Sequence, residues 1–263
     1  MASISQTLRC ACSPCPNDTF SFFHFAQNPH IQLDFYDIST LNQKAFLGEY
    51  DLIKVSFHAW LFLKEEYTLL QTGAALGRGC GPLLVARTPN SPPLQRVAVP
   101  GEYTTAHLLL RLSHPEITDR VSMPFYQIMD AVLSEKVDAG TLIHEGRFVF
   151  QEKGLYALED LGAWWEETTG HPIPLGCIIA KKSLGTLRIA QLEKQLQSSI
   201  RSAQEYPEPA IAYARQHAQE LDEEVLKKHI ETYVNHFTLQ LGEEGLAAIA
   251  ELEKRAKTAG VIP

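Results

Sequence analysis

The chain has 263 residues, 45% of them hydrophobic, and its 31 acidic residues outnumber 23 lysines and arginines to give a net charge of −8. That length suits one large α/β domain or two lobes of ordinary size. The acidic balance argues against nucleic acid or an anionic membrane as a partner. Because the sequence has no leader-like start and no run near the roughly 20 apolar residues of a membrane span, we expect a cytoplasmic protein with a small-molecule partner.

The first predicted elements are a strand and a helix joined by a turn with two prolines. Alternation over 8–12 predicts the strand, and the apolar stripe that begins at Phe20 predicts the helix. Pro16 disfavours helix at the residue before it, so the turn is rigid and Asn17 or Asp18 is the expected N-cap. Since a helix start attracts anions and carbonyl oxygens, Asn17 is a candidate binding residue.

A βα rhythm continues through the first third of the chain. The expected elements are a strand over 31–35, a helix capped by Ser39 or Thr40 that ends near Gly48, a strand over 52–55 and a helix over 58–65. Ser56 therefore stands at the carboxyl end of a strand. Small residues and glycines over 73–82, followed by the apolar run 83–86, indicate an extended segment rather than a helix, and we expect the first crossing at about residues 82–88.

A second βα series begins after the proline-rich turn at 88–93. Its expected elements are a strand over 97–99, a turn over 100–105, a helix over 106–112 capped by Thr104 or Thr105, a strand over 121–125, a helix over 126–135 and a strand over 139–143. Residues 160–165 are expected as an aromatic turn and 174–181 as a second extended crossing. Three apolar stripes with helical spacing predict helices in the rest of the chain. One contains Leu192, the second follows an N-cap at Asp222, and the third begins near Leu246.

The two crossings predict a chain that leaves its first lobe, builds a second and returns. We assign residues 1–87 and 178–263 to a larger, discontinuous α/β lobe and residues 88–177 to a second α/β lobe. In open α/β sheets the ligand crevice lies beyond the carboxyl ends of the strands. The opening turn, Ser56, the threonine-containing turn and His144 are therefore expected to line one cleft between the lobes.

His144 is the candidate base of this cleft. It follows a strand of small and apolar residues, so we expect a partly desolvated ring with a pKa poised for proton transfer near neutrality. Glu145 points to the opposite face by strand alternation, and His217, His229 and His236 are expected as surface or packing residues. The sequence has no Gly-x-Ser-x-Gly, Walker or Gly-x-Gly-x-x-Gly motif, so serine hydrolases, NTPases and dinucleotide enzymes lack their signatures here.

An acidic protein needs a local device to hold an acidic ligand. The turn at 100–105 aims helix N–H groups into the cleft and adds the hydroxyls of Thr104 and Thr105. Gly101 allows the backbone to approach a ligand closely. This turn is therefore the first candidate site for a carboxylate.

Charged residues near the two turns complete that prediction. Asp18 and Glu102 would repel a carboxylate, so both are expected to cap a helix or face solvent. Arg78 is the second candidate for the carboxylate contact.

Five cysteines, an odd number in a protein without an export signal, are expected to be free thiols. Cys10, Cys12 and Cys15 invite a metal interpretation. However, no second Cys or His pair completes a zinc site, and two of the three lie on one face of a predicted strand, where cysteine acts as a small hydrophobe. We therefore expect no metal site.

Separate motifs in one order, spread over nearly the whole chain, carry a family resemblance. They are Ser13-Pro14-Cys15-Pro16-Asn17-Asp18-Thr19-Phe20, Gly73-Ala74-Ala75-Leu76-Gly77-Arg78-Gly79, Thr104-Thr105-Ala106, Ile143-His144-Glu145 and Asp160-Leu161-Gly162-Ala163-Trp164-Trp165-Glu166. With them the chain resembles the 1,4-dihydroxy-6-naphthoate synthases of the futalosine route to menaquinone. The first motif separates this family from its sister, the chorismate dehydratases.

The resemblance implies a two-lobed, periplasmic-binding-protein-like (type II) fold, in agreement with the two crossings. It implies a carbon–carbon lyase that converts cyclic dehypoxanthine futalosine to 1,4-dihydroxy-6-naphthoate and releases a three-carbon sugar fragment, dihydroxyacetone. Proton removal, C–C cleavage and aromatisation require neither a metal nor a redox cofactor, so we expect none. At the matching positions His144 corresponds to the proposed base, and Asn42, Ser56 and Thr105 correspond to residues that contact polar groups of the ligand.

Two alternatives stay open. One is a chorismate dehydratase-like enzyme of the same pathway, and the other is a non-catalytic small-molecule binding protein, because two-lobed folds are widely used for solute capture. The oligomeric state does not follow from the sequence.

Overall fold

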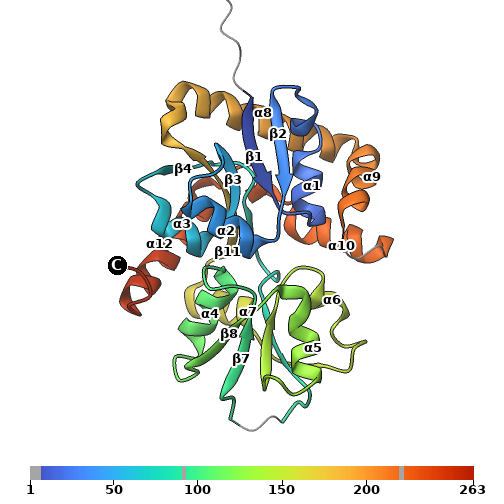
Figure 1. Cartoon of the computed structure of the whole chain (residues 1–263), viewed down its shortest axis with the longest axis vertical. Coiled ribbons are helices and arrows are strands. Elements are labelled where there is room, and N and C mark those ends of the chain that lie inside the picture. Colours follow the sequence, from blue (N-terminus) through green and yellow to red (C-terminus); the bar gives the residue numbers. More distant parts are fainter. Residues whose placement is uncertain (1–6, 91–92, 219–221) are drawn as a thin grey trace, which may run out of the picture.

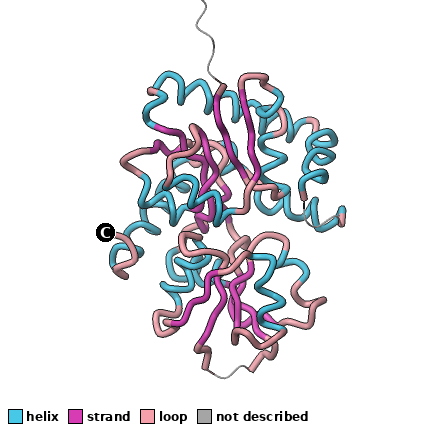
Figure 2. The backbone as a smooth tube through the Cα atoms, in the orientation of Figure 1, coloured by secondary structure: helices cyan, strands magenta, loops and turns pink. Residues whose placement is uncertain are grey.

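The computed structural model describes residues 7–90, 93–218 and 222–263. They form two lobes stacked along the long axis of the molecule (Figure 1). Each lobe has a central sheet with helices packed around it (Figure 2). The predicted two-lobed α/β architecture is therefore present.

The larger sheet forms the core of the first lobe. Its strands among the described residues are β1 (Leu8–Cys12), β2 (Ile31–Phe35), β3 (Leu52–Ser56), β4 (Tyr67–Leu69), β5 (Ala75–Gly77) and β11 (Ile173–Lys181). The order is β2-β1-β3-β11-β4, and β5 also pairs with β11. β1 runs parallel to β2 and β3, whereas β11 runs antiparallel to β3, β4 and β5. A strand that follows the second lobe in sequence thus lies inside the sheet of the first.

The helices of the first lobe come from both ends of the chain. They are α1 (Pro16–Phe22), α2 (Ile38–Phe46), α3 (Phe57–Leu63), α8 (Thr186–Glu205), α9 (Pro207–His217), α10 (Glu223–Tyr233), α11 (His236–Leu239) and α12 (Gly242–Thr258), with short 3₁₀ turns η1 (Phe25–Gln27) and η3 (Lys182–Leu184). α1 packs against α8, α9 and α10, and α12 packs against β11. The final helices therefore belong to the first lobe, as predicted.

The second lobe is built around the smaller sheet. Its strands are β6 (Leu83–Ala86), β7 (Arg96–Val99), β8 (Asp119–Ser122), β9 (Ala139–Leu142) and β10 (Tyr156–Asp160), in the order β10-β6-β9-β7-β8. Its helices are α4 (Thr105–Ser113), α5 (Ile128–Leu133), α6 (Gly146–Val149), α7 (Leu161–Thr169) and the 3₁₀ turn η2 (Phe125–Gln127). β7 runs parallel to β8 and β9, while β6 runs antiparallel to β9 and β10.

As judged by strand pairing, both lobe boundaries lie closer to the N-terminus than predicted. β6, which the predicted boundary at 87 put in the first lobe, pairs in the smaller sheet, and β11, which begins at Ile173, pairs in the larger one. Both segments are apolar and extended, as the sequence indicates, but they are strands within the sheets. The connections between the lobes are the short segments 78–82 and 170–172.

Three local predictions differ from the structure at helix starts. Asp37 caps α2 by accepting hydrogen bonds from the N–H groups of Ser39 and Thr40, so neither of those residues is the cap. Cys15 is the N-cap of α1, because Pro16 needs no hydrogen bond at the first helical position. The expected aromatic turn at 160–165 is the start of α7, which Asp160 caps.

Two other caps agree with the sequence. Thr104 caps α4 by accepting a hydrogen bond from the N–H of His107, and Asp222 caps α10. Such caps each contribute about 1 kcal/mol to helix stability, so they fix where these two helices begin.

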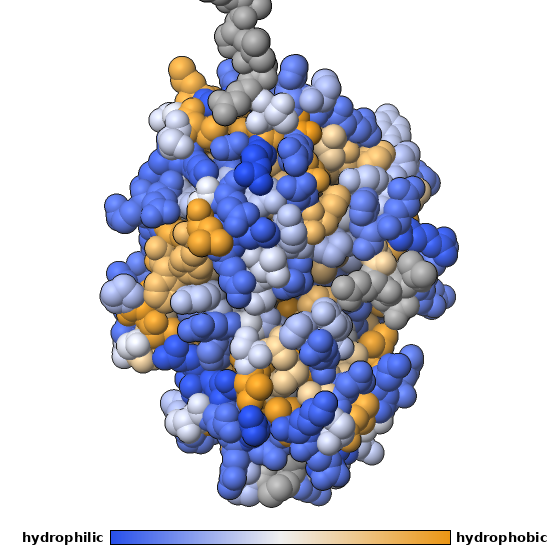
Figure 3. Space-filling model, in the orientation of Figure 1, coloured by the Kyte–Doolittle hydropathy of each residue, from blue (hydrophilic) through white to orange (hydrophobic). Residues whose placement is uncertain are grey.

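The face of the molecule shown in Figure 3 is mixed rather than segregated. On the face shown in Figure 3, polar side chains cover most of both lobes and apolar ones gather in small groups. Exposed large apolar residues include Phe46, Leu47 and Phe62, on and next to α2 and α3. None of the described helices is long and apolar enough to cross a membrane.

Candidate active site

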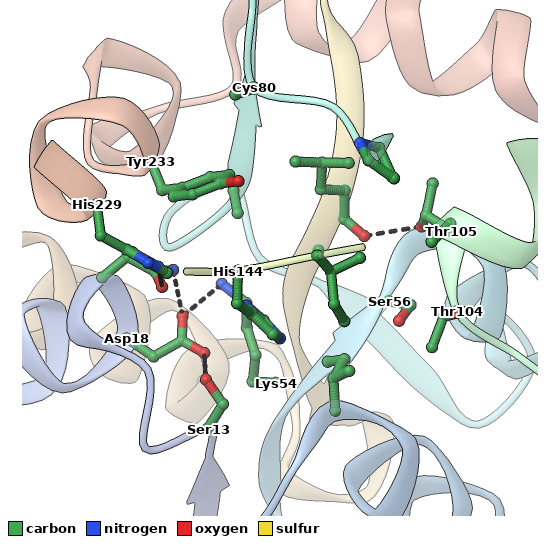
Figure 4. A pocket seen from close by; sticks show the side chains of 18 residues that line it. Ser13, Asp18, Lys54, Ser56, Cys80, Thr104, Thr105, His144, His229 and Tyr233 are labelled. Carbon is green, nitrogen blue, oxygen red and sulfur yellow. Dashed lines mark hydrogen bonds and ion pairs between the residues drawn. The ribbon is translucent and has the colours of Figure 1, made fainter. Parts of the chain in front are cut away.

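A cavity lies between the two lobes and is lined by residues of both. The first lobe contributes the polar side chains of Ser13, Asn17, Asp18, Lys54, Ser56 and His229. The second lobe contributes Thr104, Thr105 and His144. In Figure 4, Ser13, Asp18, His144 and His229 lie toward one end of this cavity, and Ser56, Thr104 and Thr105 lie toward the other. The strand ends predicted to converge therefore do so.

His144 follows β9 in a conformation that L-residues rarely adopt. Its φ is 56°, in the left-handed region, which typically costs about 1 kcal/mol or more and often marks a functional site. This turn of the backbone brings Nδ1 of the ring within 3.4 Å of Sγ of Cys15. The other ring nitrogen, Nε2, is buried and has no hydrogen-bond partner among the described residues.

The surroundings of His144 keep its ring neutral. Desolvation lowers the pKa of His144 below its ordinary value of 6.5, and the nearby carboxylates of Glu145 and Asp18 offset only part of this effect. The Cys15 thiol stays protonated, because burial raises its pKa well above the usual range. A neutral imidazole is a competent proton acceptor at Nε2 in the tautomer that carries its hydrogen on Nδ1, next to Sγ of Cys15.

Asp18 faces the cavity, contrary to the expectation that it caps a helix or faces solvent. Asp18 as a whole residue is 4% exposed, and its carboxylate forms a 2.8 Å ion pair with Nζ of Lys54. It also accepts hydrogen bonds from Oγ of Ser13 at 2.6 Å and Nδ2 of Asn17 at 3.0 Å. The carboxylate is tolerated inside the protein because each of these donors compensates for lost water.

Sequence reasoning missed Lys54, although a signal was available. Lys54 stands two residues before Ser56 in the buried strand β3, so strand alternation puts both side chains on one face. Its Nζ also donates to the carbonyl oxygen of Gly73. A lysine within an otherwise apolar strand predicts a partner or a function, and here it has both a carboxylate partner and a place in the cavity wall.

His229 was expected as a surface or packing residue, and the structure shows that it is not on the surface. It is 1% exposed, lines the cavity from α10, and its ring stacks on that of His144 with centroids 6.2 Å apart. Its Nε2 lies 3.0 Å from Oδ1 of Asn17. The available signal was spacing, because His229 stands four residues before Tyr233 on the apolar stripe of α10, and both residues line the cavity.

Ser56 and Asn42 are hydrogen-bonded to each other, and of the two only Ser56 lines the cavity. Oγ of Ser56 accepts a hydrogen bond from Nδ2 of Asn42, and the backbone N–H of Ser56 donates to Oδ1 of the same amide. Asn42 does not line the cavity, but it also donates to the carbonyl oxygen of Tyr103 in the second lobe. Asn42 therefore positions Ser56 and links the two lobes at the cavity wall.

The start of α4 forms the opposite wall. Thr104, Thr105 and Ala106 all line the cavity, which puts the first-turn N–H groups of a nine-residue helix there. Both hydroxyl protons are already used, since Thr104 Oγ1 donates to the carbonyl oxygen of Gly101 and Thr105 Oγ1 donates to that of Leu175. An anion at this wall would therefore meet backbone N–H groups first.

Arg78 lies outside the cavity and is not its second anion contact. Its guanidinium is on the surface, where it pairs with Glu244 and donates to the carbonyl oxygen of Gly170. Glu102 is exposed, as predicted.

All five cysteines are free and buried, as predicted for thiols. Burial raises the pKa of Cys80 to about 12, which leaves it protonated at neutral pH. Within the described residues no group of three or more His, Cys, Asp or Glu side chains has the geometry to hold a metal ion.

Two α/β lobes that enclose one cavity define a protein of the periplasmic-binding-protein-like class. In agreement, the structure matches the periplasmic aliphatic sulphonate binding protein of Escherichia coli with a TM-score of 0.65 and 12% identity, over 97% of this chain and 88% of that one. This comparison confirms the fold.

Sequence comparison identifies the family within that class. A family described as "Menaquinone biosynthesis" matches residues 8–258. Two proteins named 1,4-dihydroxy-6-naphtoate synthase are similar to this chain. The one from Streptomyces coelicolor is 45% identical over 98% of this chain and 96% of its own length, and the one from Thermus thermophilus is 43% identical over 97% and 96%. The chain belongs to the 1,4-dihydroxy-6-naphthoate synthase family of menaquinone biosynthesis.

Proposed function

We propose that this protein converts cyclic dehypoxanthine futalosine to 1,4-dihydroxy-6-naphthoate with release of dihydroxyacetone, and that His144 is the general base. The observation that carries the proposal is the buried, unpartnered Nε2 of a neutral imidazole in the cavity between the lobes. For Nε2 to accept a proton from a bound substrate, Nδ1 must carry the ring hydrogen and donate it to Sγ of Cys15, a weak acceptor. In that tautomer the lone pair of Nε2 has no competing hydrogen bond.

The polarity of the cavity fits a ligand with an acidic end. The start of α4 offers backbone N–H groups and the positive end of a helix dipole, and these favour a carboxylate. The opposite end holds Asp18, which would repel a carboxylate, together with its ion-pair partner Lys54. We therefore orient the substrate with its carboxylate at α4 and its reacting ring at His144.

Lys54 is positioned to stabilise the negative charge that develops during this reaction. Removal of a proton and cleavage of a C–C bond shift negative charge onto an oxygen of the reacting ring. A lysine ammonium in the cavity wall, held in place by Asp18 and the Gly73 carbonyl, supplies a fixed positive charge near that ring. Aromatisation of the product then supplies much of the driving force.

The direct test is conversion by the pure protein. Protein mixed with cyclic dehypoxanthine futalosine under anaerobic conditions should produce naphthoate absorbance, and mass spectrometry should detect one dihydroxyacetone for each naphthoate. A parallel reaction with chorismate tests the sister dehydratase activity and should stay unchanged. Binding of the futalosine derivative without a spectral change would instead support a non-catalytic binding protein.

The base is tested with His144→Asn. The amide keeps a polar side chain but offers no basic nitrogen, so turnover should fall by about 10²- to 10⁴-fold while substrate still binds. Near-native turnover in this variant would show that another group removes the proton.

A further inference from the structure

The feature that the proposed base leaves unexplained is the second histidine of the cavity, His229. It is 1% exposed and comes from α10 in the first lobe, opposite His144 from the second. Its Nδ1 is buried and has no hydrogen-bond partner among the described residues. A buried, unpaired polar atom is costly, so one on a residue that lines a ligand cavity points to a bound partner.

The hydrogen bonds around His229 determine which of its nitrogens carries the proton. The Asn17 amide donates through Nδ2 to the Asp18 carboxylate, which can only accept. The Oδ1 atom of Asn17 therefore faces Nε2 of His229 as an acceptor, and Nε2 must carry the hydrogen. Because burial and the neighbouring His144 hold the pKa of His229 well below 6.5, the ring is neutral and Nδ1 presents a bare lone pair.

We propose that Nδ1 of His229 accepts a hydrogen bond from a ring hydroxyl of the ligand, and that His229 is thereby a specificity-determining residue of the reaction. An acceptor selects a donor, and in the dihydroxynaphthoate product the hydroxyls lie on the ring opposite the one that carries the carboxylate. His229 lies at the end of the cavity opposite the start of α4 (Figure 4). A ligand bound with its carboxylate at the N–H groups of α4 and a hydroxyl at His229 would thus have a hydrogen-bond partner at each end of the cavity.

This inference rests on the proposed function, because it takes its ligand from that reaction. It assigns to the Ser13, Asp18 and Asn17 network a role that does not depend on the base. The network fixes the Asn17 amide, the amide fixes the tautomer of His229, and the tautomer leaves an acceptor rather than a donor at Nδ1.

The test compares two ligands that differ only in the hydroxyls, 1,4-dihydroxy-6-naphthoate and 2-naphthoate, by anaerobic calorimetry. His229→Gln places an amide near the position of Nε2, so it can still donate to Asn17 but has no acceptor at Nδ1. Its preference for the dihydroxy ligand over 2-naphthoate should fall by about tenfold relative to the unchanged protein, as expected for one lost hydrogen bond to a buried group. His229→Asn, whose amide oxygen can occupy the Nδ1 position, should keep more of that preference.

Each other outcome has a separate meaning. Equal weakening of both ligands in His229→Gln would make His229 a packing residue, and unchanged preference would put the hydroxyl elsewhere, so either result overturns the inference. If the unchanged protein binds neither ligand, the proposed function fails rather than the role of His229.

A spectroscopic measurement on the unchanged protein covers the case in which the variants do not fold. With ¹⁵N-labelled histidine, the resonance of an unprotonated ring nitrogen should shift upfield on addition of the dihydroxy ligand and stay in place with 2-naphthoate. Absence of that difference would also overturn the inference.

Discussion

Nδ1 of His144 and Sγ of Cys15 lie 3.4 Å apart, although His144 belongs to the second lobe and Cys15 to the first. Other contacts join the lobes around the same cavity. Asn42 donates to the carbonyl oxygen of Tyr103, and the ring of His58 bonds the carbonyl oxygen of Thr104. The position of the candidate base in the cavity thus depends on contact between the lobes, and we predict that closure of the lobes assembles the site.

Gly101→Ala should interfere with this closure. Gly101 has a φ of 138°, and a Cβ there would lie 2.4 Å from Oγ of Ser39 in the other lobe. Because small displacements of catalytic groups reduce rates steeply, kcat/KM should fall on the order of tenfold to a hundredfold. Solution scattering with saturating product should also give a larger radius of gyration than the unchanged protein shows.

The matched control for that variant is Gly154→Ala. Gly154 also has a positive φ, 79°, and lies in the second lobe, but its Cβ would meet no atom within 4 Å. It should lose some stability to backbone strain and keep its activity. Equal loss of activity in both variants would show that strain, and not contact between the lobes, is responsible.

The pH profile of kcat/KM should show that the pKa of the candidate base, His144, is below the ordinary value for histidine. Desolvation lowers the pKa of His144, so the ring stays in its basic form at neutral pH and is protonated only under more acidic conditions. Activity should therefore be constant from pH 8 to about pH 6.5 and fall at lower pH. An acid limb centred above pH 6.5 would contradict this assignment of the pKa.

The buried pair of Asp18 and Lys54 should show strong coupling. Both side chains are 5% exposed. Asp18→Asn or Lys54→Met alone leaves a buried charge without its partner and should lower the free energy of unfolding by about 3–5 kcal/mol. The double variant should be more stable than the sum of the single losses predicts, as measured by urea unfolding at pH 7. Additive losses would show that the two charges do not stabilise each other.

His58 should make the protein less stable in acid. Burial and the neighbouring His107 lower the pKa of His58 to about 4. In the unfolded chain the pKa of His58 is near the ordinary 6.5, so the unfolded state binds the proton more strongly than the folded state. The free energy of unfolding is therefore unaffected by His58 above pH 6.5 and decreases as the pH falls from 6.5 toward 4. Between pH 7.5 and pH 5 the loss from this group is about 2 kcal/mol.

His58→Asn tests that contribution, because its amide can still donate to the Thr104 carbonyl but does not titrate. In urea unfolding at the two pH values, the variant should lose about 2 kcal/mol less than the unchanged protein does. Parallel losses in the two proteins would show that His58 does not contribute to the acid sensitivity.

Sequence patterns were sufficient for the two-lobed α/β class and for part of the polar lining of the cavity. Period-two runs and proline turns gave the strands, and polar residues at strand ends led to Ser56, Thr104, Thr105 and His144, which line one cavity. The sequence did not predict that the two apolar crossings are the strands β6 and β11. An extended apolar segment has the same composition whether it pairs inside a sheet or connects two lobes.

The residues that sequence reasoning misplaced depend on partners far away in the chain. The inward-facing carboxylate of Asp18 pairs with Lys54, 36 positions later, and His229 is held by Asn17, 212 positions earlier. Arg78 was predicted as an anion contact, but its guanidinium pairs with Glu244 and donates to the carbonyl oxygen of Gly170. A single sequence gives the charge and spacing of such residues, but not the pairs they form.

The central place of β11 in the larger sheet also orders events during synthesis. The strands of the smaller sheet occupy the contiguous span 83–160, so that sheet can be completed on the ribosome soon after its last strand emerges. The larger sheet cannot, because β11 separates β3 from β4 and is made more than a hundred residues after them. Until then β3 has an open edge that can pair with other chains, and the second lobe should fold first while the first lobe waits for residues 173–181.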